Sequence, residues 1–209
     1  MTDWETESTE ARESPIPMLA VRPGVRLRVD LANFEALCPG NKDVRLELTA
    51  DGFLIVELPY TLDPGWRITE ILGRLGAWNE RAGLGVALTS SVGYLLPNGA
   101  VRGPVLSWMT NERWAGLSDE DHDRPVTRAV PDFVVEMRSW LKAGIDFRAK
   151  MAEYVSQGVR LGWLIDPITK TVEISRPGRD VEILTRPATL SGEDVLPGFT
   201  LDLKGILFD

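Results

Sequence analysis

The feature that most constrains the fold is a short hydrophobic run, residues 131–137 with the sequence PDFVVEM, which carries a glutamate near its end. Phe133, Val134 and Val135 are aromatic or β-branched and follow a proline, so the run predicts a strand of a buried sheet. An ionised carboxylate avoids a dry interior unless it is paired, hydrogen-bonded or bound to a metal. Glu136 therefore indicates a polar site built into the core.

The composition predicts one globular domain. The chain has 209 residues, of which 44% are hydrophobic, and we expect a single domain over residues 21–209 behind a disordered acidic tail at residues 1–20. No apolar run approaches the roughly 20 residues that span a bilayer. The N-terminus lacks the pattern of a secretory signal, and Cys38 alone allows no internal disulfide. We therefore expect a cytoplasmic protein.

Several common kinds of site are excluded or disfavoured. His122 is the single histidine and lies in the polar segment LSDEDHDRP, which predicts a solvated loop. One histidine and one cysteine are too few for a Cys/His zinc site, and a histidine in a solvated loop disfavours a Ser–His–Asp triad. Neither GxxxxGK[ST] nor GxGxxG occurs, so both phosphate-binding glycine loops are absent.

The net charge of −8 does not decide whether nucleic acid is a partner. Half of that charge lies in residues 1–13, where five acidic residues face Arg12 alone. Residues 124–150 instead carry six basic residues against three acidic ones. This basic cluster fits either a nucleic-acid surface or an ordinary solvated surface.

Hydrophobic periodicity and turn residues predict a mixed sheet flanked by two main helices, an α/β or α+β sandwich. A shorter helix precedes the two main ones, with Asp30 as a plausible N-cap. Gly83 is a plausible end of the first main helix. The predicted elements are a helix at 30–38, a hairpin at 44–59, a helix at 67–83, short strands at 85–109 with a turn at 97–99, a helix at 144–157, and strands from 161 to the C-terminus.

Glu136 needs partners from outside its own strand. Asp132 lies four strand residues away, which is about 13 Å, so the two carboxylates cannot share one cation, and we expect Asp132 to satisfy loop or helix-end amides. Arg138 shares the face of Glu136 and could pair with phosphate. Lys150 on the following helix could reach the sheet, although a surface pair with Asp146 fits its spacing equally well.

The order of these parts resembles a known family. PDFVVEMRS, a helix with Lys150, and YVSQGVRLGWLIDP are similar to segments of the Uma-type restriction endonucleases, which belong to the PD-(D/E)xK nuclease-like superfamily. RLELTADGFLIVELP, SSVGYLLPNGAVRGP and LSGEDVLPGFTLDL also match segments of that family in order, so the resemblance covers about residues 30–208.

The resemblance implies a restriction-endonuclease-like mixed β-sheet with helices on its faces. It also implies Mg²⁺-dependent (or Mn²⁺-dependent) hydrolysis of DNA phosphodiesters by a homodimer. Carried over residue by residue, Glu136 is an acidic metal ligand, Lys150 is the catalytic lysine, Arg138 is a further catalytic candidate, and Glu47 is a candidate further metal ligand. A plain strand residue is the competing interpretation of Glu47.

One position departs from the family pattern. The first metal-binding acid of the family falls on Val105, and valine cannot ligate a cation. Two hypotheses follow: a metal-dependent DNA endonuclease, impaired or rescued by another acid such as Glu47, or a catalytically silent nuclease fold that binds nucleic acid or a protein. A purely structural assembly protein would leave Glu136 and Lys150 unexplained.

Overall fold

The structure is a computed structural model that describes residues 26–142 and 144–208. The tail predicted at residues 1–20 lies outside the described residues. The helices are α1 (Leu31–Leu37), η1 (Cys38–Gly40, a 3₁₀ turn), α2 (Leu62–Ala82), α3 (Asn111–Ala115), α4 (Asp119–Asp123), η2 (Trp140–Lys142, a 3₁₀ turn) and α5 (Phe147–Ser156). The strands are β1 (Arg45–Leu48), β2 (Leu54–Glu57), β3 (Gly85–Thr89), β4 (Gly93–Leu95), β5 (Val101–Arg102), β6 (Leu106–Thr110), β7 (Val126–Thr127), β8 (Phe133–Met137), β9 (Leu161–Asp166), β10 (Thr171–Ser175), β11 (Glu182–Thr185), β12 (Thr189–Ser191) and β13 (Thr200–Asp202).

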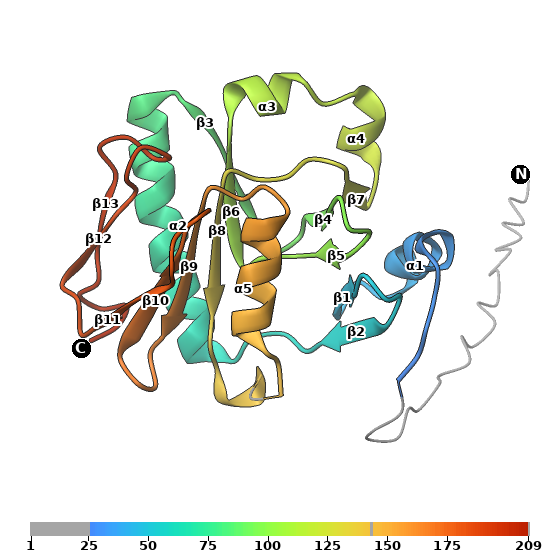
Figure 1. Cartoon of the computed structure of the whole chain (residues 1–209), viewed down its shortest axis with the longest axis horizontal. Coiled ribbons are helices and arrows are strands. Elements are labelled where there is room, and N and C mark those ends of the chain that lie inside the picture. Colours follow the sequence, from blue (N-terminus) through green and yellow to red (C-terminus); the bar gives the residue numbers. More distant parts are fainter. Residues whose placement is uncertain (1–25, 143, 209) are drawn as a thin grey trace, which may run out of the picture.

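A six-stranded sheet in the order β11–β10–β9–β8–β6–β3 forms the centre of the molecule. Its central pair β8–β9 is parallel, and the other pairs are antiparallel. Helices α2 and α5 cover its opposite faces (Figure 1). Side chains alternate along a strand, so Phe133 and Val135 join the core with α2, whereas Val134 joins the core with α5.

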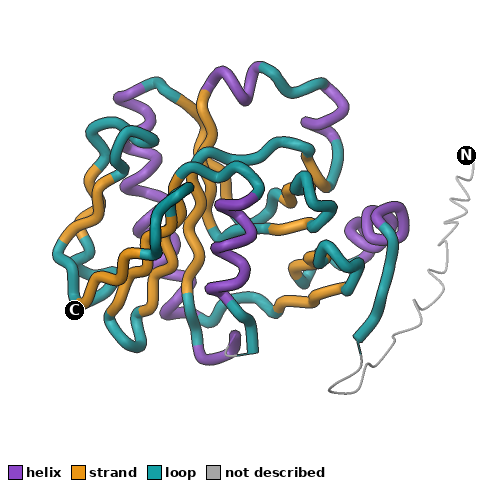
Figure 2. Tube along the Cα trace, viewed as in Figure 1, coloured by secondary structure: helices purple, strands orange, loops and turns teal. Residues whose placement is uncertain are grey.

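A second, mixed sheet in the order β2–β1–β5–β4–β7 lies beside the first (Figures 1 and 2). Helix α1 packs on it through Phe34, which is buried with Leu48, Val101 and Val126. The β12–β13 hairpin instead adds Leu190 to the core around α2. The β1–β2 hairpin lies close to α5 and to the end of β8, and the polar site forms between them (Figure 1).

The predicted mixed architecture and most predicted elements are confirmed. Asp30 caps α1 by accepting a hydrogen bond from the Asn33 amide at 2.8 Å. Gly83 ends α2 in the left-handed conformation, with φ of 64°. Among the described residues, no helix combines the length and the apolar character needed to cross a bilayer.

Two predictions of local structure are wrong. Helix α2 begins at Leu62 rather than at 67, because Pro64 lies in its first turn, where a missing N–H costs no hydrogen bond. The segment around His122 is helix α4 rather than a loop. Ser118 caps α4 through a reciprocal capping box with Asp121, and the ring of His122 packs against Trp114.

Candidate active site

Glu136 is fully buried on the face of β8 that is turned toward α5. Its Oε1 accepts a hydrogen bond from the Tyr154 hydroxyl at 3.1 Å and lies 2.8 Å from Lys150 Nζ. Its Oε2 is buried without a hydrogen-bond partner. Two side chains of α5 therefore hold one oxygen of the Glu136 carboxylate, and the other oxygen is free.

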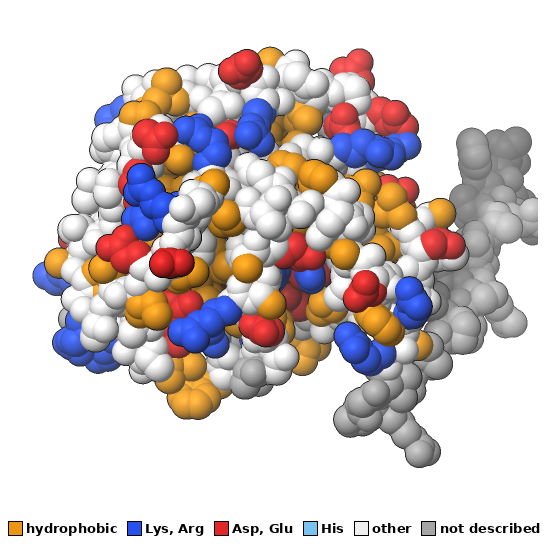
Figure 3. All heavy atoms as spheres, in the orientation of Figure 1, with side chains coloured by type: hydrophobic (Ala, Val, Ile, Leu, Met, Phe, Trp, Pro, Cys, Tyr) orange, Lys and Arg blue, Asp and Glu red, His pale blue; other side chains and the backbone are white. Residues whose placement is uncertain are grey.

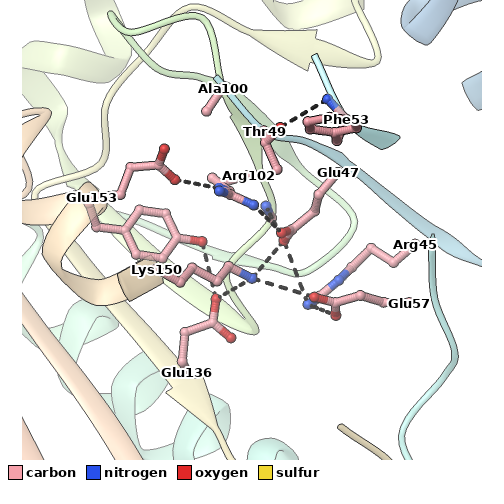
Figure 4. A network of polar contacts seen from close by, with 12 residues as sticks. Arg45, Glu47, Thr49, Phe53, Glu57, Ala100, Arg102, Glu136, Lys150 and Glu153 are labelled. Carbon is pink, nitrogen blue, oxygen red and sulfur yellow. Dashed lines mark hydrogen bonds and ion pairs between the residues drawn. The ribbon is translucent and has the colours of Figure 1, made fainter. Parts of the chain in front are cut away.

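Lys150 lies at the centre of the site, between strands of both sheets (Figure 4). Asp146 caps α5 by accepting from the Ala149 amide, so the surface pair with Lys150 that the spacing also allowed does not form. The buried Nζ of Lys150 instead lies 2.7 Å from Glu47 and 2.8 Å from Glu136. It also lies 3.6 Å from Glu57 Oε1. One ammonium thus touches three carboxylates.

The β1–β2 hairpin supplies the other two carboxylates of this centre. Arg45 and Glu57 are direct cross-strand partners, and alternation along β1 puts Arg45 and Glu47 on the same face. Glu47 Oε1 accepts from the Gly103 amide at 2.9 Å, and its Oε2 accepts from Arg102 at 3.3 Å. Both oxygens of Glu47 therefore have protein donors.

Glu57 is one of the site residues that sequence reasoning missed. One of its oxygens pairs with Arg45 and with Lys142 of η2, while its Oε1 is buried without a hydrogen-bond partner. Its signal in the sequence is weak: alternation puts Arg45, Glu47 and Glu57 on one face of the hairpin, but the sequence does not show that this face is buried. Its pairing with Lys142, which is 85 residues away along the chain, has no local signature.

The charges of the network are balanced. Its members are the carboxylates of Glu47, Glu57, Glu136 and Glu153 and the cations of Arg45, Arg102, Lys142 and Lys150. Glu153 lies at the outer end, where Arg102 donates to it at 2.5 Å and Asn98 at 2.9 Å. A buried charge needs such compensation, because removing one partner leaves an uncompensated ion in the interior.

The environment moves the pKa values of these groups in different directions. Burial raises the pKa of Glu136 above its ordinary value, against the opposing charge of Lys150. Burial alone would lower the pKa of Lys150, but the three neighbouring glutamates outweigh burial and raise it. Burial alone would raise the pKa of Glu57, but the surrounding cations lower it to about 2. Glu57 is therefore ionised at neutral pH.

A cavity of about 480 Å³ opens onto the network. Figure 3 shows charged side chains in a hollow between α5 and the β1–β2 hairpin. The cavity is lined by three cationic side chains, Arg26, Arg102 and Lys150, and by four acidic ones, Glu47, Glu57, Asp146 and Glu153. Its lining is therefore slightly acidic, which favours a cation as the first species to enter.

Val105 immediately precedes β6, the strand that pairs with β8, and does not join the network. The ladder pairs Leu106 with Val135, and the Val105 amide also donates to the Val135 carbonyl at 3.1 Å. Val105 and Leu106 thus both lie opposite Val135, as in a β-bulge. The Val105 side chain is packed in the apolar core that contains Leu106 and Met137. This position therefore contributes packing and no ligand.

Arg138 and Asp132 lie outside the network. Arg138 is 3.6 Å from Asp166 and stands over the ring of Phe147, away from Lys150 and Glu136 in the contacts of the described residues. Asp132 accepts from the Thr110 amide at 3.0 Å, at the start of α3, and pairs with Arg113 at 3.1 Å. Asp132 has the structural role that its spacing predicted.

The fold resembles that of a protein whose structure has been solved. A solved structure from Anabaena variabilis ATCC 29413, described as "a putative nuclease belonging to DUF820", aligns with a TM-score of 0.67 and 16% sequence identity, over 78% of this chain and 89% of that chain. At this identity the likeness shows the fold alone, and it confirms the predicted fold class. None of the curated proteins matches the chain.

The family is shown by the sequence itself. The family model Uma2, described as "Putative restriction endonuclease", matches residues 31–204, which is more than half of the chain. The chain therefore belongs to the Uma2 restriction endonuclease family. The resemblance seen in the sequence blocks is confirmed.

Proposed function

We propose that this protein is a divalent-metal-dependent DNA endonuclease with its active site at Glu136 and Lys150. One observation carries the proposal: the ammonium of Lys150 lies between Glu47 and Glu136, at 2.7 and 2.8 Å, beside an unpartnered oxygen of Glu136. Carboxylates that can hold a cation beside a lysine suit metal-dependent hydrolysis of a phosphodiester. Membership of the Uma2 family supports this proposal.

The residues present fit a cation with a small number of protein ligands. Within the described part of the chain, no group of three or more Asp, Glu, His or Cys side chains is arranged to hold a metal. Mg²⁺, however, usually takes one or two carboxylates and completes its shell with water and substrate phosphate. Glu136 offers a free buried oxygen, and Glu47 is the second acid that the family resemblance suggests. Mg²⁺ or Mn²⁺ is the ion we propose.

The side chains around the cavity have distinct roles in this proposal. A bound divalent cation would supply charge stabilisation and an activated water. Lys150 keeps its positive charge at neutral pH, because its neighbours raise its pKa, and it donates hydrogen bonds toward the charge that develops on the phosphate. Tyr154 donates to Glu136 Oε1 and fixes the direction of that carboxylate. Arg102 holds Glu47 against the Gly103 loop.

A second candidate function is a catalytically silent nuclease fold that binds nucleic acid or a protein. The observation that favours it is Val105, which is 1% exposed in the apolar core where the family has its first acid. The network is also electrically balanced without a metal. DNA as the partner, a homodimer and residence in the cytoplasm remain predictions from the resemblance and the composition.

Nicking of supercoiled plasmid separates the two candidates. We expect the wild-type chain to nick plasmid with Mg²⁺ or Mn²⁺ and not with EDTA, and Glu136→Gln to abolish nicking. Glu173→Gln is the matched control, because Glu173 is a buried carboxylate paired with Arg148 outside the network. Absence of wild-type nicking with either metal, in protein that thermal unfolding shows to be folded, would identify the silent fold.

A further inference from the structure

Two carboxylate oxygens in the site lack any donor. Among the buried side-chain atoms of the described residues, Glu57 Oε1 and Glu136 Oε2 are the carboxylate oxygens without a hydrogen-bond partner. A buried group left unpaired costs about 1–3 kcal/mol, and more when it is charged. Two such oxygens in one network therefore point to a cationic ligand that would satisfy both.

The two carboxylates that carry these free oxygens lie on either side of the same ammonium. Lys150 Nζ lies 2.8 Å from Glu136 Oε1 and 3.6 Å from Glu57 Oε1. Figure 4 shows Glu136 and Glu57 on either side of the end of Lys150. The longer separation on the Glu57 side is beyond a hydrogen bond, so Glu57 Oε1 approaches the ammonium without being held by it.

Glu47 is placed differently. Its Oε1 already receives the Gly103 amide and Lys150, and its Oε2 receives Arg102. A cation that bound Glu47 would compete with three donors, one of them a backbone amide fixed by the chain. Glu57, by contrast, uses one oxygen for Arg45 and Lys142 and keeps the other free.

We propose that the structure assigns the divalent-cation site to Glu57 and Glu136. Glu57 thereby takes the place of the acid that is missing at Val105, and Glu47 is a positioning residue that holds Lys150 and Arg102. This inference rests on the proposed function and identifies the second ligand of the same site. The ion is a hard divalent cation such as Mg²⁺ or Mn²⁺, because both ligands are carboxylate oxygens.

Arg45 and Lys142 pre-orient Glu57 for this role. They bind the far oxygen of the carboxylate from β1 and from η2, and Lys142 also stands 3.9 Å from the centre of the Tyr60 ring. Groups that hydrogen-bond a ligand from behind fix its orientation, and their loss weakens metal binding. The free oxygen of Glu57 is therefore held in a fixed direction.

Calorimetric titration of Mn²⁺ into the full chain without nucleic acid tests the assignment. We expect Glu57→Gln to lower the affinity at least about tenfold relative to wild type, the scale of losing a group of a metal site. Glu57→Asp should also lower the affinity. This variant keeps the negative charge beside Arg45 and Lys142, but its shorter side chain moves the free carboxylate oxygen away from the cation. Glu173→Gln removes an equal charge outside the network and should stay within about threefold, because neither Glu173 nor its partner Arg148 lines the cavity.

The outcomes separate this inference from the proposed function. Thermal unfolding checks the fold of each variant, and Glu57→Asp carries the test if Glu57→Gln does not fold. Wild-type binding that survives both Glu57 variants but is lost in Glu47→Gln would overturn the assignment and leave the proposed function standing. Wild-type protein that binds no Mn²⁺ would overturn both.

Discussion

Strand β8 presents two faces of opposite chemistry. On the α2 side, Phe133, Val135 and Met137 are fully buried among apolar side chains. On the α5 side, Glu136 is just as buried but lies among charges. The apolar face is stabilised by packing alone and needs no charged partner. The polar face is stable only as a balanced set, because each charge there depends on its neighbours.

The largest expected effect comes from removing the centre of the polar face. Lys150→Met leaves the buried Glu136 and Glu47 without their shared ammonium. We expect a loss of about 3–5 kcal/mol in the free energy of unfolding, which is typical of breaking a buried ion pair. Urea unfolding at neutral pH measures it, and a loss below about 1 kcal/mol would show that the network is solvated.

A cavity on the apolar face should cost a similar amount for a different reason. Phe133 is fully buried and packs edge-on against Trp163, with 4.8 Å between ring centroids. We expect Phe133→Ala to cost about 3–5 kcal/mol, through lost burial and a cavity. The two faces then differ in pH response: the Phe133→Ala loss should stay constant on acidification, while the Lys150→Met loss should shrink as the carboxylates protonate. Parallel pH profiles would contradict the comparison.

Glu57 should make the polar face sensitive to acid. Its pKa in the folded state is lowered to about 2, from an ordinary value of 4.5. A lowered pKa stabilises the fold above the ordinary value, and that stability is lost as pH falls toward the folded-state value. The shift corresponds to up to about 3 kcal/mol. With EDTA present, the difference in unfolding free energy between wild type and Glu57→Gln should shrink by this order between pH 5 and pH 2. A difference that stays constant over this range would contradict the ion pairing of Glu57.

A smaller effect is expected where α5 approaches the sheet. A Cβ added at Gly162 of β9 would lie 2.4 Å from Met151 Cε and 3.4 Å from Val134. The methionine end can move, so we expect Gly162→Ala to cost about 1 kcal/mol by overpacking. Urea unfolding measures this cost. Gly76→Ala on α2, where the added Cβ meets nothing within 4 Å, is the matched control and should not destabilise the protein.

The smallest effect is expected at Arg138, which the sequence suggested as a catalytic residue. Its side chain is 31% exposed and lies 3.6 Å from Asp166. Arg138→Ala should change stability by less than about 1 kcal/mol, as for a surface ion pair. Plasmid nicking and Mn²⁺ affinity should equal those of wild type. A large loss of nicking would restore Arg138 to the active site.

The sequence predicted the parts of the molecule that depend on local patterns. The hairpin at 44–59, helices α1, α2 and α5 and strand β8 follow from periodicity, caps and turn residues. Lys150 was suggested by its place on the helix and by the family resemblance, and Glu47 by the resemblance alone. Glu57 and Lys142 were missed because their pairing depends on tertiary packing. The core-facing side chain of Val105 follows from a bulge that has no clear sequence signal.

The most direct test of the central claim is a crystal structure with Mn²⁺, read from its anomalous scattering. The account predicts one strong peak beside Lys150, within about 2.5 Å of Glu136 Oε2 and Glu57 Oε1. The same peak should vanish in Glu136→Gln crystals soaked alike. A peak bound to other side chains, or no peak at a Mn²⁺ concentration that saturates binding in solution, would contradict the claim that the polar face of β8 is built for a divalent cation.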